Sequence, residues 1–528
     1  MKKKQTLLIL AAIILLAAFL RFYSLSDNRI GFFRDEAALG FNTWSILKTG
    51  ADEYGQNLPI IFRSFEVFFL PAYVYLSIPI FYFFGLTTFS ARALSALSGV
   101  LLVPVAYLIV DQLSKSKKIG LLAAFLTAIS PWSIFYSRGA FEGNLALLFF
   151  SIGFYFWLRF INLGQNKFYF FSITAFIASM YSYQAPRLVA PLFIGISILI
   201  QKRWWRKWKL WLAGGIFALV LYSPIAMLTT SSAGYHRAIG VSIFSNENGQ
   251  QKYSKVPQEM LSLYASYFSP NNLFLQSDYN PQRRVIGFSV FYLWQFPLLI
   301  FGLYKIFKSK DLKIKNLLVW LLIAPIPASL TRDPFHTYRA LLFFLPVTVL
   351  ITFGADYLLS LAKKYKHLIL FIIVPIIIYS LSSYYFALFK TTAVINWRDW
   401  DYGYDQISEF IKKDEFKLYR VVIDDPNTTS YIHLLYNQAV SLSLYQESAN
   451  TQGKYYITPD ILRPQKVGRF EFKKVDWPSE RGDPNTLFIF PSNRLHPSEF
   501  SGDPKLSLEK TIYAPSGEAA FYIIKTKT

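Results

Sequence analysis

The sequence lacks cysteine and is poor in charge. None of its 528 residues is a cysteine, which excludes disulfides, thiolate metal sites and cysteine nucleophiles. Its five histidines are scattered without the spacing of a zinc site, and neither a GxxxxGK[ST] loop nor a GxGxxG turn is present. Charged residues make up only 16%, whereas soluble domains contain about a quarter. These absences exclude a disulfide scaffold and leave no recognisable nucleotide site.

The abundant residues are apolar. Hydrophobic residues make up 53% of the chain and aromatic residues 18%, more than the core of a soluble protein of this length would hold. The same composition excludes intrinsic disorder and collagen-like fibres. The sequence therefore predicts an integral membrane protein.

The net charge of +22 is distributed as in a membrane protein. Residues 391–528 are nearly neutral, with 17 Lys or Arg and 18 Asp or Glu, whereas residues 1–390 carry 37 and 14. In residues 1–390 the basic residues gather in short breaks between apolar runs of about 16–24 residues, close to the length that crosses a bilayer. This is the positive-inside pattern rather than a nucleic-acid-binding face.

The apolar runs predict eleven membrane spans. The first, 5–20, follows three lysines and has no small-residue cleavage site, so we expect an uncleaved anchor with a cytoplasmic N-terminus rather than a signal peptide. The aromatic run 67–84 contains two prolines and suits an interfacial helix. Without it, 21 basic and 3 acidic residues lie inside against 16 and 11 outside, and the C-terminus is outside. The other predicted spans lie near 91–112, 119–135, 144–162, 168–183, 186–201, 210–228, 285–304, 316–330, 338–361 and 368–389.

Two domains are predicted. Residues 1–390 form a polytopic α-helical membrane domain with long outer loops at 21–90 and 229–284, the second containing an amphipathic piece near 257–268. Residues 391–528 form a small extracytoplasmic α/β domain. Its expected helices lie at 404–413 and 430–438, and its expected strands at 419–423, 455–458, 486–490 and 520–526.

Ionisable groups near a bilayer are costly, so their positions are informative. Asp35 and Glu36 open a predicted helix that runs to about Leu47. In a structural interpretation, Asp35 caps this helix and Glu36 complements its dipole. In a functional interpretation, one carboxylate of the pair is a general base at the membrane face.

Two short outer connections carry further candidates. Residues 136–144 hold Arg138, Glu142 and Asn144, where Arg138 either pairs with Glu142 or binds a phosphate through two parallel hydrogen bonds. Residues 331–339 form either an interfacial belt or an anion site, whose residues are His336, Tyr338 and Arg339. A transferase facing outward has no nucleotide donor there, so an activated donor would have to arrive on a lipid.

These residues resemble the GT-C membrane glycosyltransferases, specifically the protein O-mannosyltransferase and aminoarabinose-transferase-like family. The resemblance rests on the Asp-Glu pair in the first outer loop, the Pro-bearing stretch PAYVYL at 71–76, FSARALSAL at 89–97, and Ser-Pro at 130–131 leading to Tyr-Ser-Arg at 136–138. It covers about residues 1–200, and 285–390 by architecture. The C-terminal domain has no match in it.

The resemblance implies an inverting transfer of a monosaccharide from a polyprenyl-phosphate-linked donor to a hydroxyl on a protein, lipid or glycan. Asp35, with Glu36 beside it, would be the base or orient the acceptor, and the lipid phosphate would contact Arg138, with His336, Tyr338 and Arg339 as further phosphate ligands. Glu66 resembles an acidic position of aminoarabinose transferases, and Glu142 and Asn144 would contact substrate. Many relatives carry an Asp shortly after the arginine, where this chain has Gly143.

The expected partners are the lipid-linked sugar, the acceptor and membrane lipids, in a multi-pass protein of a prokaryotic cell membrane with its active site outside. The scheme requires no cofactor and no metal, although neighbouring carboxylates could bind a divalent cation in oligosaccharide-transferring relatives. Two alternatives stay open. One is an oligosaccharyltransferase or glycan ligase of the same fold, against which the short connection 136–144 counts. The other is a transporter or lipid-binding protein. Such a protein is expected to have charged residues near the bilayer midplane and internal repeats, and the sequence has neither.

Overall fold

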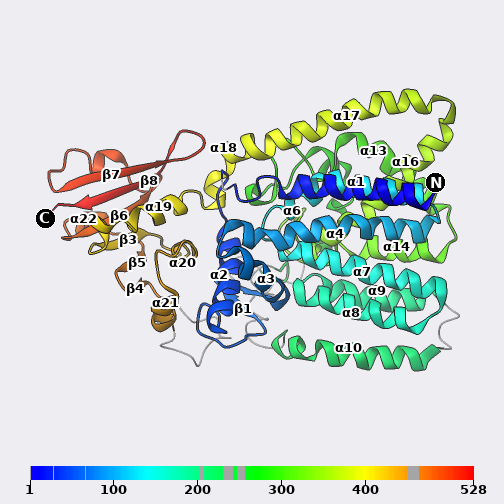
Figure 1. Ribbon diagram of the computed structural model, residues 1–528, viewed down its shortest axis with the longest axis horizontal. Helices are drawn as coiled ribbons and strands as arrows, with labels where there is room; N and C mark the ends of the chain where they lie inside the picture. The colour runs from blue at the N-terminus through cyan, green and yellow to red at the C-terminus, as the bar shows by residue number, and fades with distance from the viewer. Residues whose placement is uncertain are drawn as a thin grey trace. The chain divides into compact units, whose positions relative to one another are not determined.

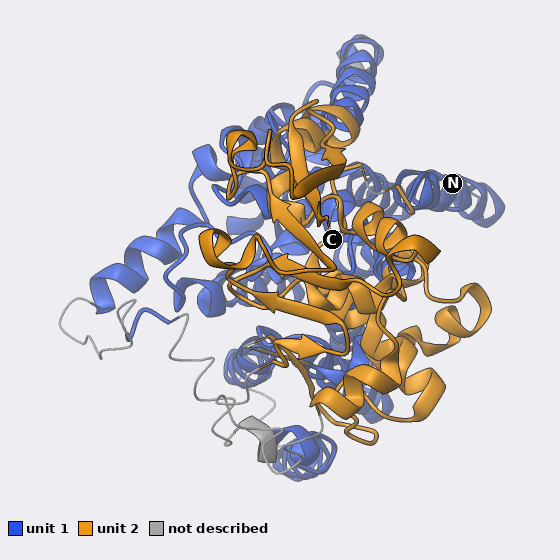
Figure 2. Cartoon of the chain, turned by 90° about the vertical axis from the view of Figure 1, so that its left-hand side faces the viewer, with its two compact units in different colours: residues 1–25, 70–73, 92–387 blue, residues 26–69, 74–91, 388–528 orange. Residues whose placement is uncertain are grey.

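A computed structural model describes residues 2–27, 29–65, 67–201, 207–229, 242–245, 256–449 and 463–527. Contacts divide the chain into two compact units, coloured separately in Figure 2. Unit 1 comprises residues 1–25, 70–73 and 92–387, and unit 2 comprises residues 26–69, 74–91 and 388–528. Most of the predicted first outer loop therefore belongs to the same unit as the predicted C-terminal domain. No pattern in the sequence predicts this pairing, and the predicted domain boundary at 390 stays a prediction.

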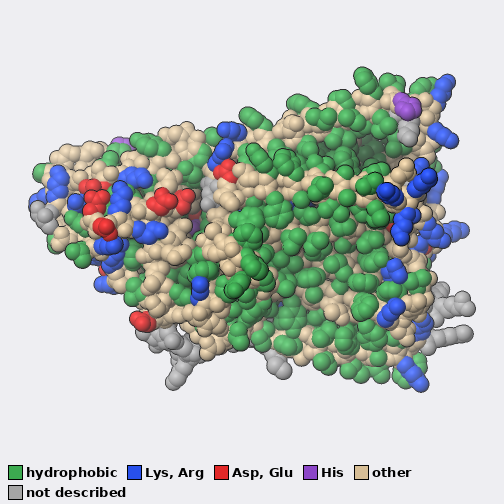
Figure 3. Space-filling view, viewed as in Figure 1, with side chains coloured by type: hydrophobic (Ala, Val, Ile, Leu, Met, Phe, Trp, Pro, Cys, Tyr) green, Lys and Arg blue, Asp and Glu red, His purple; other side chains and the backbone are tan. Residues whose placement is uncertain are grey.

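Unit 1 consists of helices, most of which run side by side (Figure 1). Apolar residues line their outer surfaces, whereas Lys and Arg side chains gather at the end of the helices where the N-terminus lies (Figure 3). The helices are α1 (Lys3–Phe22), α4 (Thr88–Ser114), α5 (Lys117–Ile129), α6 (Pro131–Ser137), α7 (Glu142–Leu163), α8 (Asn166–Ser182), α9 (Pro186–Leu199), α10 (Trp208–Thr229), α12 (Val256–Ser266), α13 (Phe296–Phe307), α14 (Leu312–Ile323), α15 (Ile326–Ser329), α16 (Phe344–Leu361) and α17 (Lys366–Phe386).

Each of the eleven predicted spans contains a helix. Among the described residues, seven helical stretches are long and apolar enough to cross a membrane, or eight if the bent pair α5–α6 counts as one span. Helices α9 and α13 are apolar but shorter. The prediction for 285–304 was wrong in its first part, because helical structure there begins only at Leu293 and the preceding residues form a loop.

A buried arginine holds the bend of 56° between α5 and α6. Pro131 has no N–H to donate to the carbonyl of Thr127, four residues earlier, so the helix breaks there. Arg21, at the end of α1, donates to the freed carbonyls of Thr127 and Ala128 over 3.3 and 3.0 Å. After the bend, α6 leads directly into the connection 136–144.

Unit 2 begins with the first outer loop. Its elements are α2 (Arg34–Thr49), the antiparallel strands β1 (Phe62–Ser64) and β2 (Val67–Phe69), and α3 (Pro71–Phe84). Helix α2 confirms the helix predicted from Arg34 to Leu47. Helix α3 has only 14 residues, and its last three aromatic side chains, Tyr82, Phe83 and Phe84, are exposed. Its length agrees with its exclusion from the spans, and its interfacial position stays a prediction.

The rest of unit 2 is a six-stranded sheet with flanking helices. The strand order is β4-β5-β3-β6-β8-β7, with β3 parallel to β5 and β6 and the other pairs antiparallel. The apolar faces of β3, β6 and β8 pack around Phe488, Phe490 and Trp477. The elements are α18 (Thr392–Asn396), α19 (Tyr404–Ile411), β3 (Arg420–Asp424), α20 (Tyr431–Tyr436), α21 (Leu442–Ala449), β4 (Lys466–Val467), β5 (Phe470–Lys473), α22 (Trp477–Glu480), β6 (Thr486–Pro491), β7 (Leu506–Tyr513) and β8 (Ala519–Thr526).

The structure confirms both helices predicted for 391–528 and the strands at 419–423, 486–490 and 520–526. The strand expected at 455–458 lies outside the described residues. Strands β4, β5 and β7 were not predicted. Strand β7 alternates apolar and polar residues only imperfectly, and its ladder with β8 is interrupted by two register shifts.

Candidate active site

The two carboxylates of the first loop have different environments. Glu36 is buried, and its Oε2 accepts a hydrogen bond from the backbone N–H of Phe33 at 3.2 Å, at the start of α2. The residue that caps α2 is therefore Phe33 rather than Asp35, and Glu36, at the third helical position, accepts a hydrogen bond from its backbone N–H. Asp35 is half-buried. Of the pair, Asp35 is the carboxylate that solvent reaches.

A strong ion pair holds the residue before Asp35. Arg34 donates from Nε and NH2 to the two carboxylate oxygens of Asp401 at 3.0 and 2.7 Å, and its backbone N–H donates to the same carboxylate at 3.0 Å. His433 Nε2 lies 3.6 Å from Asp401. Burial alone would raise the pKa of Asp401, but His433 and Arg34 outweigh it and lower that pKa. The first turn of α2 is thus anchored to the C-terminal region.

A second buried acid joins the same parts of unit 2. Glu53 is fully buried between Asn42 of α2, whose Nδ2 lies 3.3 Å from Oε1, and Tyr431 of α20, whose hydroxyl lies 3.4 Å from Oε2. Burial and then the charge of Asp52 raise the pKa of Glu53 to about 8, which its hydrogen bonds only partly oppose. Glu53 is therefore mostly protonated at neutral pH.

In unit 1, Arg138 closes the end of α1. Its NH1 donates to the carbonyls of Leu20, Arg21 and Tyr23 over 3.3, 3.1 and 2.8 Å, and its NH2 donates to that of Ser24 over 3.2 Å. Carbonyls at a helix end lack partners inside the helix, and a guanidinium satisfies them well. The predicted contact of Arg138 with a phosphate stays a prediction.

The connections 136–144 and 331–339 meet at Tyr338. Its hydroxyl accepts from the backbone N–H of Gly143 at 3.0 Å and is hydrogen-bonded to Glu142. Asn144 instead turns toward α4, where its Nδ2 donates to the Ser95 carbonyl at 2.8 Å. Glu142 and Tyr338 therefore form one buried pair, and Asn144 ties α7 to α4.

His336 and Arg339 surround a carboxylate of their own connection. Asp333 Oδ2 lies 3.6 Å from His336 Nε2, from Arg339 NH1 and from NH1 of Arg283, which comes from the other outer loop. Burial, followed by the charges of Arg339 and Arg283, lowers the pKa of His336 well below its ordinary value. The ring is neutral at physiological pH and offers hydrogen bonds rather than charge.

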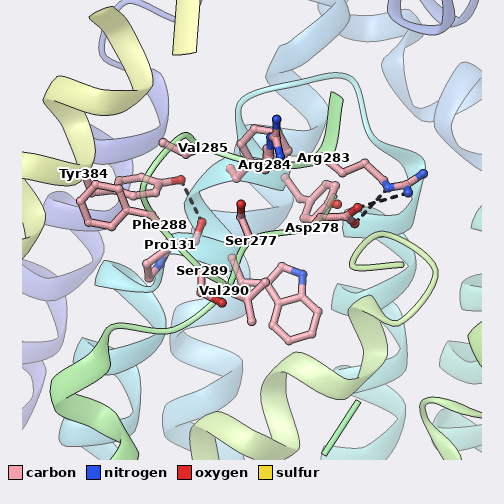
Figure 4. A pocket seen from close by; sticks show the side chains of 13 residues that line it. Pro131, Ser277, Asp278, Arg283, Arg284, Val285, Phe288, Ser289, Val290 and Tyr384 are labelled. Atoms are coloured by element: carbon pink, nitrogen blue, oxygen red, sulfur yellow. Dashed lines mark hydrogen bonds and ion pairs between the residues drawn. The ribbon is translucent and has the colours of Figure 1, made fainter. Parts of the chain in front are cut away.

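Next to this network lies a narrow pocket with a cavity volume of about 20 Å³ (Figure 4). Arg283 is held by Asp278, with Nε 3.0 Å from Oδ2, while the neighbouring Arg284 and Ser277 lie between Asp278 and Tyr384. The Nε of Arg284 is buried and has no hydrogen-bond partner among the described residues. The pocket therefore offers an uncommitted cationic donor, which suits an anion.

Asp278, Arg283 and Arg284 are not among the site residues predicted from the sequence. The available signal was the Arg-Arg pair directly before the apolar run 285–304. Of the predicted site residues, Glu66 lies outside the described residues. In the part of the chain that the structure describes, no group of three or more His, Asp or Glu side chains is arranged to hold a metal ion.

Comparisons with known proteins identify the fold of the chain. A family model described as dolichyl-phosphate-mannose-protein mannosyltransferase matches residues 71–228. Two solved structures of ArnT from Cupriavidus metallidurans, one in the apo state and one bound to undecaprenyl phosphate, each match with a TM-score of 0.59 and 12% identity, covering 99% of this chain and 98% of theirs. The chain has a GT-C fold.

The GT-C fold confirms the predicted fold class, and the family model over residues 71–228 supports the resemblance seen in the sequence. A structure of the Archaeoglobus fulgidus oligosaccharyltransferase tethered with an acceptor peptide matches with a TM-score of 0.47 and 14% identity, covering 83% of this chain and 63% of that one. No curated protein matches the sequence.

Proposed function

We propose that this GT-C protein is an inverting glycosyltransferase, which moves a monosaccharide from a polyprenyl-phosphate-linked donor to a hydroxyl acceptor on the outer face of the membrane. The observation that carries the proposal is the match to ArnT over nearly the whole of both chains, including a structure bound to undecaprenyl phosphate. The mannosyltransferase family model over residues 71–228 supports the same reaction class.

Asp35 is the proposed base. It takes the proton of the acceptor hydroxyl as that oxygen attacks the anomeric carbon of the sugar. The bond between that carbon and the phosphate oxygen breaks, and the polyprenyl phosphate leaves with the electron pair. A single displacement of this kind inverts the anomeric configuration. A positioned base contributes about 10²–10⁴-fold to such a step, and a phosphate leaves well without a general acid.

The pocket beside Arg284 is the proposed donor-phosphate site. A departing phosphate gains negative charge, and a preorganised guanidinium stabilises that charge without reorganising. Arg283 is already neutralised by Asp278, so Arg284 is the residue there whose buried Nε lacks a protein acceptor among those described. Ser277 and Tyr384 line the same pocket.

The charges of unit 1 support the outward orientation. Lys3 and Lys4 begin α1, whereas Arg138 binds the carbonyls at its other end. With lysines and arginines gathered at the N-terminal end of the helices (Figure 3), the positive-inside rule favours that end as cytoplasmic. Arg138 would then lie near the outer face.

The test is D35N, assayed for transfer of radiolabel from a polyprenyl-phosphate sugar by purified protein. The amide keeps the size of the side chain but cannot accept the proton, so we expect a loss of at least about 100-fold in kcat. D27N is the matched control, since Asp27 lies in the same loop and pairs with Arg29 at 2.9 Å. The expected result is loss of transfer in D35N alone, with an unchanged melting temperature. Normal turnover by D35N would overturn the assignment of the base.

A further inference from the structure

The C-terminal part of unit 2 contains an open pocket with a cavity volume of about 170 Å³. Strand ends of β6 and β8 form one side of it, and the segment between α18 and α19 forms the other. Its lining includes four aromatic and two polar side chains: Trp397, Tyr402, Tyr404, Phe521, Arg398 and Asn493.

The chain between α18 and α19 is shaped to present these rings. Asp401 and Gly403 both have positive φ, 51° and 96°, which reverses the chain twice and places Tyr402 and Tyr404 on the pocket wall. Trp397 and Tyr402 meet edge to face at 6.3 Å, and Tyr404 meets Phe521 in the same manner at 5.2 Å. The wall therefore consists of fixed aromatic rings.

Polar groups stand at the edge of these rings. Asn493 is exposed in the turn that follows β6. Arg398 packs over Trp397 at 4.6 Å and reaches Glu518 at 3.0 Å while remaining more than half exposed. A pyranose ring has an apolar face of C–H groups and a rim of hydroxyls. Arg398 covers a face of Trp397, and Tyr404 stacks on His433. The half-exposed Tyr402 is therefore the ring that can meet the C–H face, with an amide and a guanidinium nearby for the hydroxyls.

The pocket shares a residue with the anchor of the proposed base. Asp401 lines the pocket, and its carboxylate holds the backbone N–H and the guanidinium of Arg34, next to Asp35. We propose that this pocket binds a sugar residue of the acceptor, so that the acceptor of this enzyme is a glycan. The inference rests on the proposed function, because it assigns the pocket to the acceptor rather than to an unrelated ligand.

The test measures binding and transfer separately, with the full chain in lipid nanodiscs. Saturation-transfer difference NMR with a panel of hexose disaccharides, and with a serine-containing hexapeptide, reports binding. In N493W the exposed amide is replaced by an indole that fills the pocket, and N493A removes only the amide. N166A is the matched control, since Asn166 is an exposed asparagine in α8.

We expect at least one disaccharide to bind the wild type and N166A with equal affinity. Its affinity for N493W should be about tenfold lower than for the wild type, and its affinity for N493A should also be lower than for the wild type. In the transfer assay N493W should raise the KM for a glycan acceptor more than the KM for the donor. Binding that depends on Asn493 without any transfer by the wild type would uphold the pocket and overturn the proposed function. Absence of disaccharide binding, equal binding by N493W, or selective binding of the hexapeptide would overturn the pocket assignment.

Discussion

Replacing Asp401 by Asn tests how the C-terminal region supports Asp35. The substitution keeps the size of the side chain and one acceptor oxygen but removes the charge and one of the two guanidinium contacts. Asp401 has a φ of 51°, a conformation that Asn tolerates as well as Asp does, so backbone strain does not confuse the result. The variant therefore isolates the ion pair with Arg34.

The geometry sets the expected size of the effect. A hydrogen bond to a charged group contributes about 1.5–3 kcal/mol. Asp401 is largely buried, but the Arg34 side chain is 31% exposed, so we take the lower part of that range, about 1.5–2 kcal/mol of unfolding free energy. Loss of the anchor also loosens the first turn of α2. Because misplacement by about 1 Å costs up to about 100-fold, we expect kcat to fall by about 10- to 100-fold.

Thermal melting in detergent and the radiolabel transfer assay measure both effects. The folded pKa of Asp401 lies below its unfolded value of about 3.9, so its contribution is present above pH 4 and is lost as the pH falls through the folded pKa. The gap between wild type and D401N should be present from pH 5 to 8 and shrink below pH 4. D414N, in an exposed pair with Lys417, is the control and should melt like the wild type. Unchanged stability and kcat in D401N would refute the anchoring role.

Two further predictions concern other buried groups. Because the pKa of Glu53 is raised to about 8, its contribution to stability is full below about pH 4.3 and is lost as the pH rises toward 8. E53Q should therefore gain about 2–4 kcal/mol relative to the wild type between pH 5 and 8, and a constant difference in melting would contradict the raised pKa. R284A should raise the donor KM about 10- to 100-fold, by loss of a charged hydrogen bond, while R29A should not. Equal donor KM values for the two variants would remove Arg284 from the phosphate site.

Hydropathy and charge alone determined the class of the protein and most of its elements. Apolar runs report the transfer of a segment from water into lipid, which is a local property, so every predicted span contains a helix in the structure. Local signals also placed α2, α19 and α20. They failed at 285–292, where an apolar stretch lines a pocket as a loop instead of continuing a helix.

Only the tertiary structure decided which charged groups meet. Arg34 and Asp401 are 367 positions apart, and Arg138 and Tyr23 are 115 apart. Arg21 marked only the end of an apolar run in the sequence, yet it satisfies the carbonyls that Pro131 leaves unpaired. Composition and periodicity say that a charge is present. The partner of a charge depends on which loops the packing of the helices and the sheet brings together, and that determined the environments of Asp35, Glu53 and Arg284.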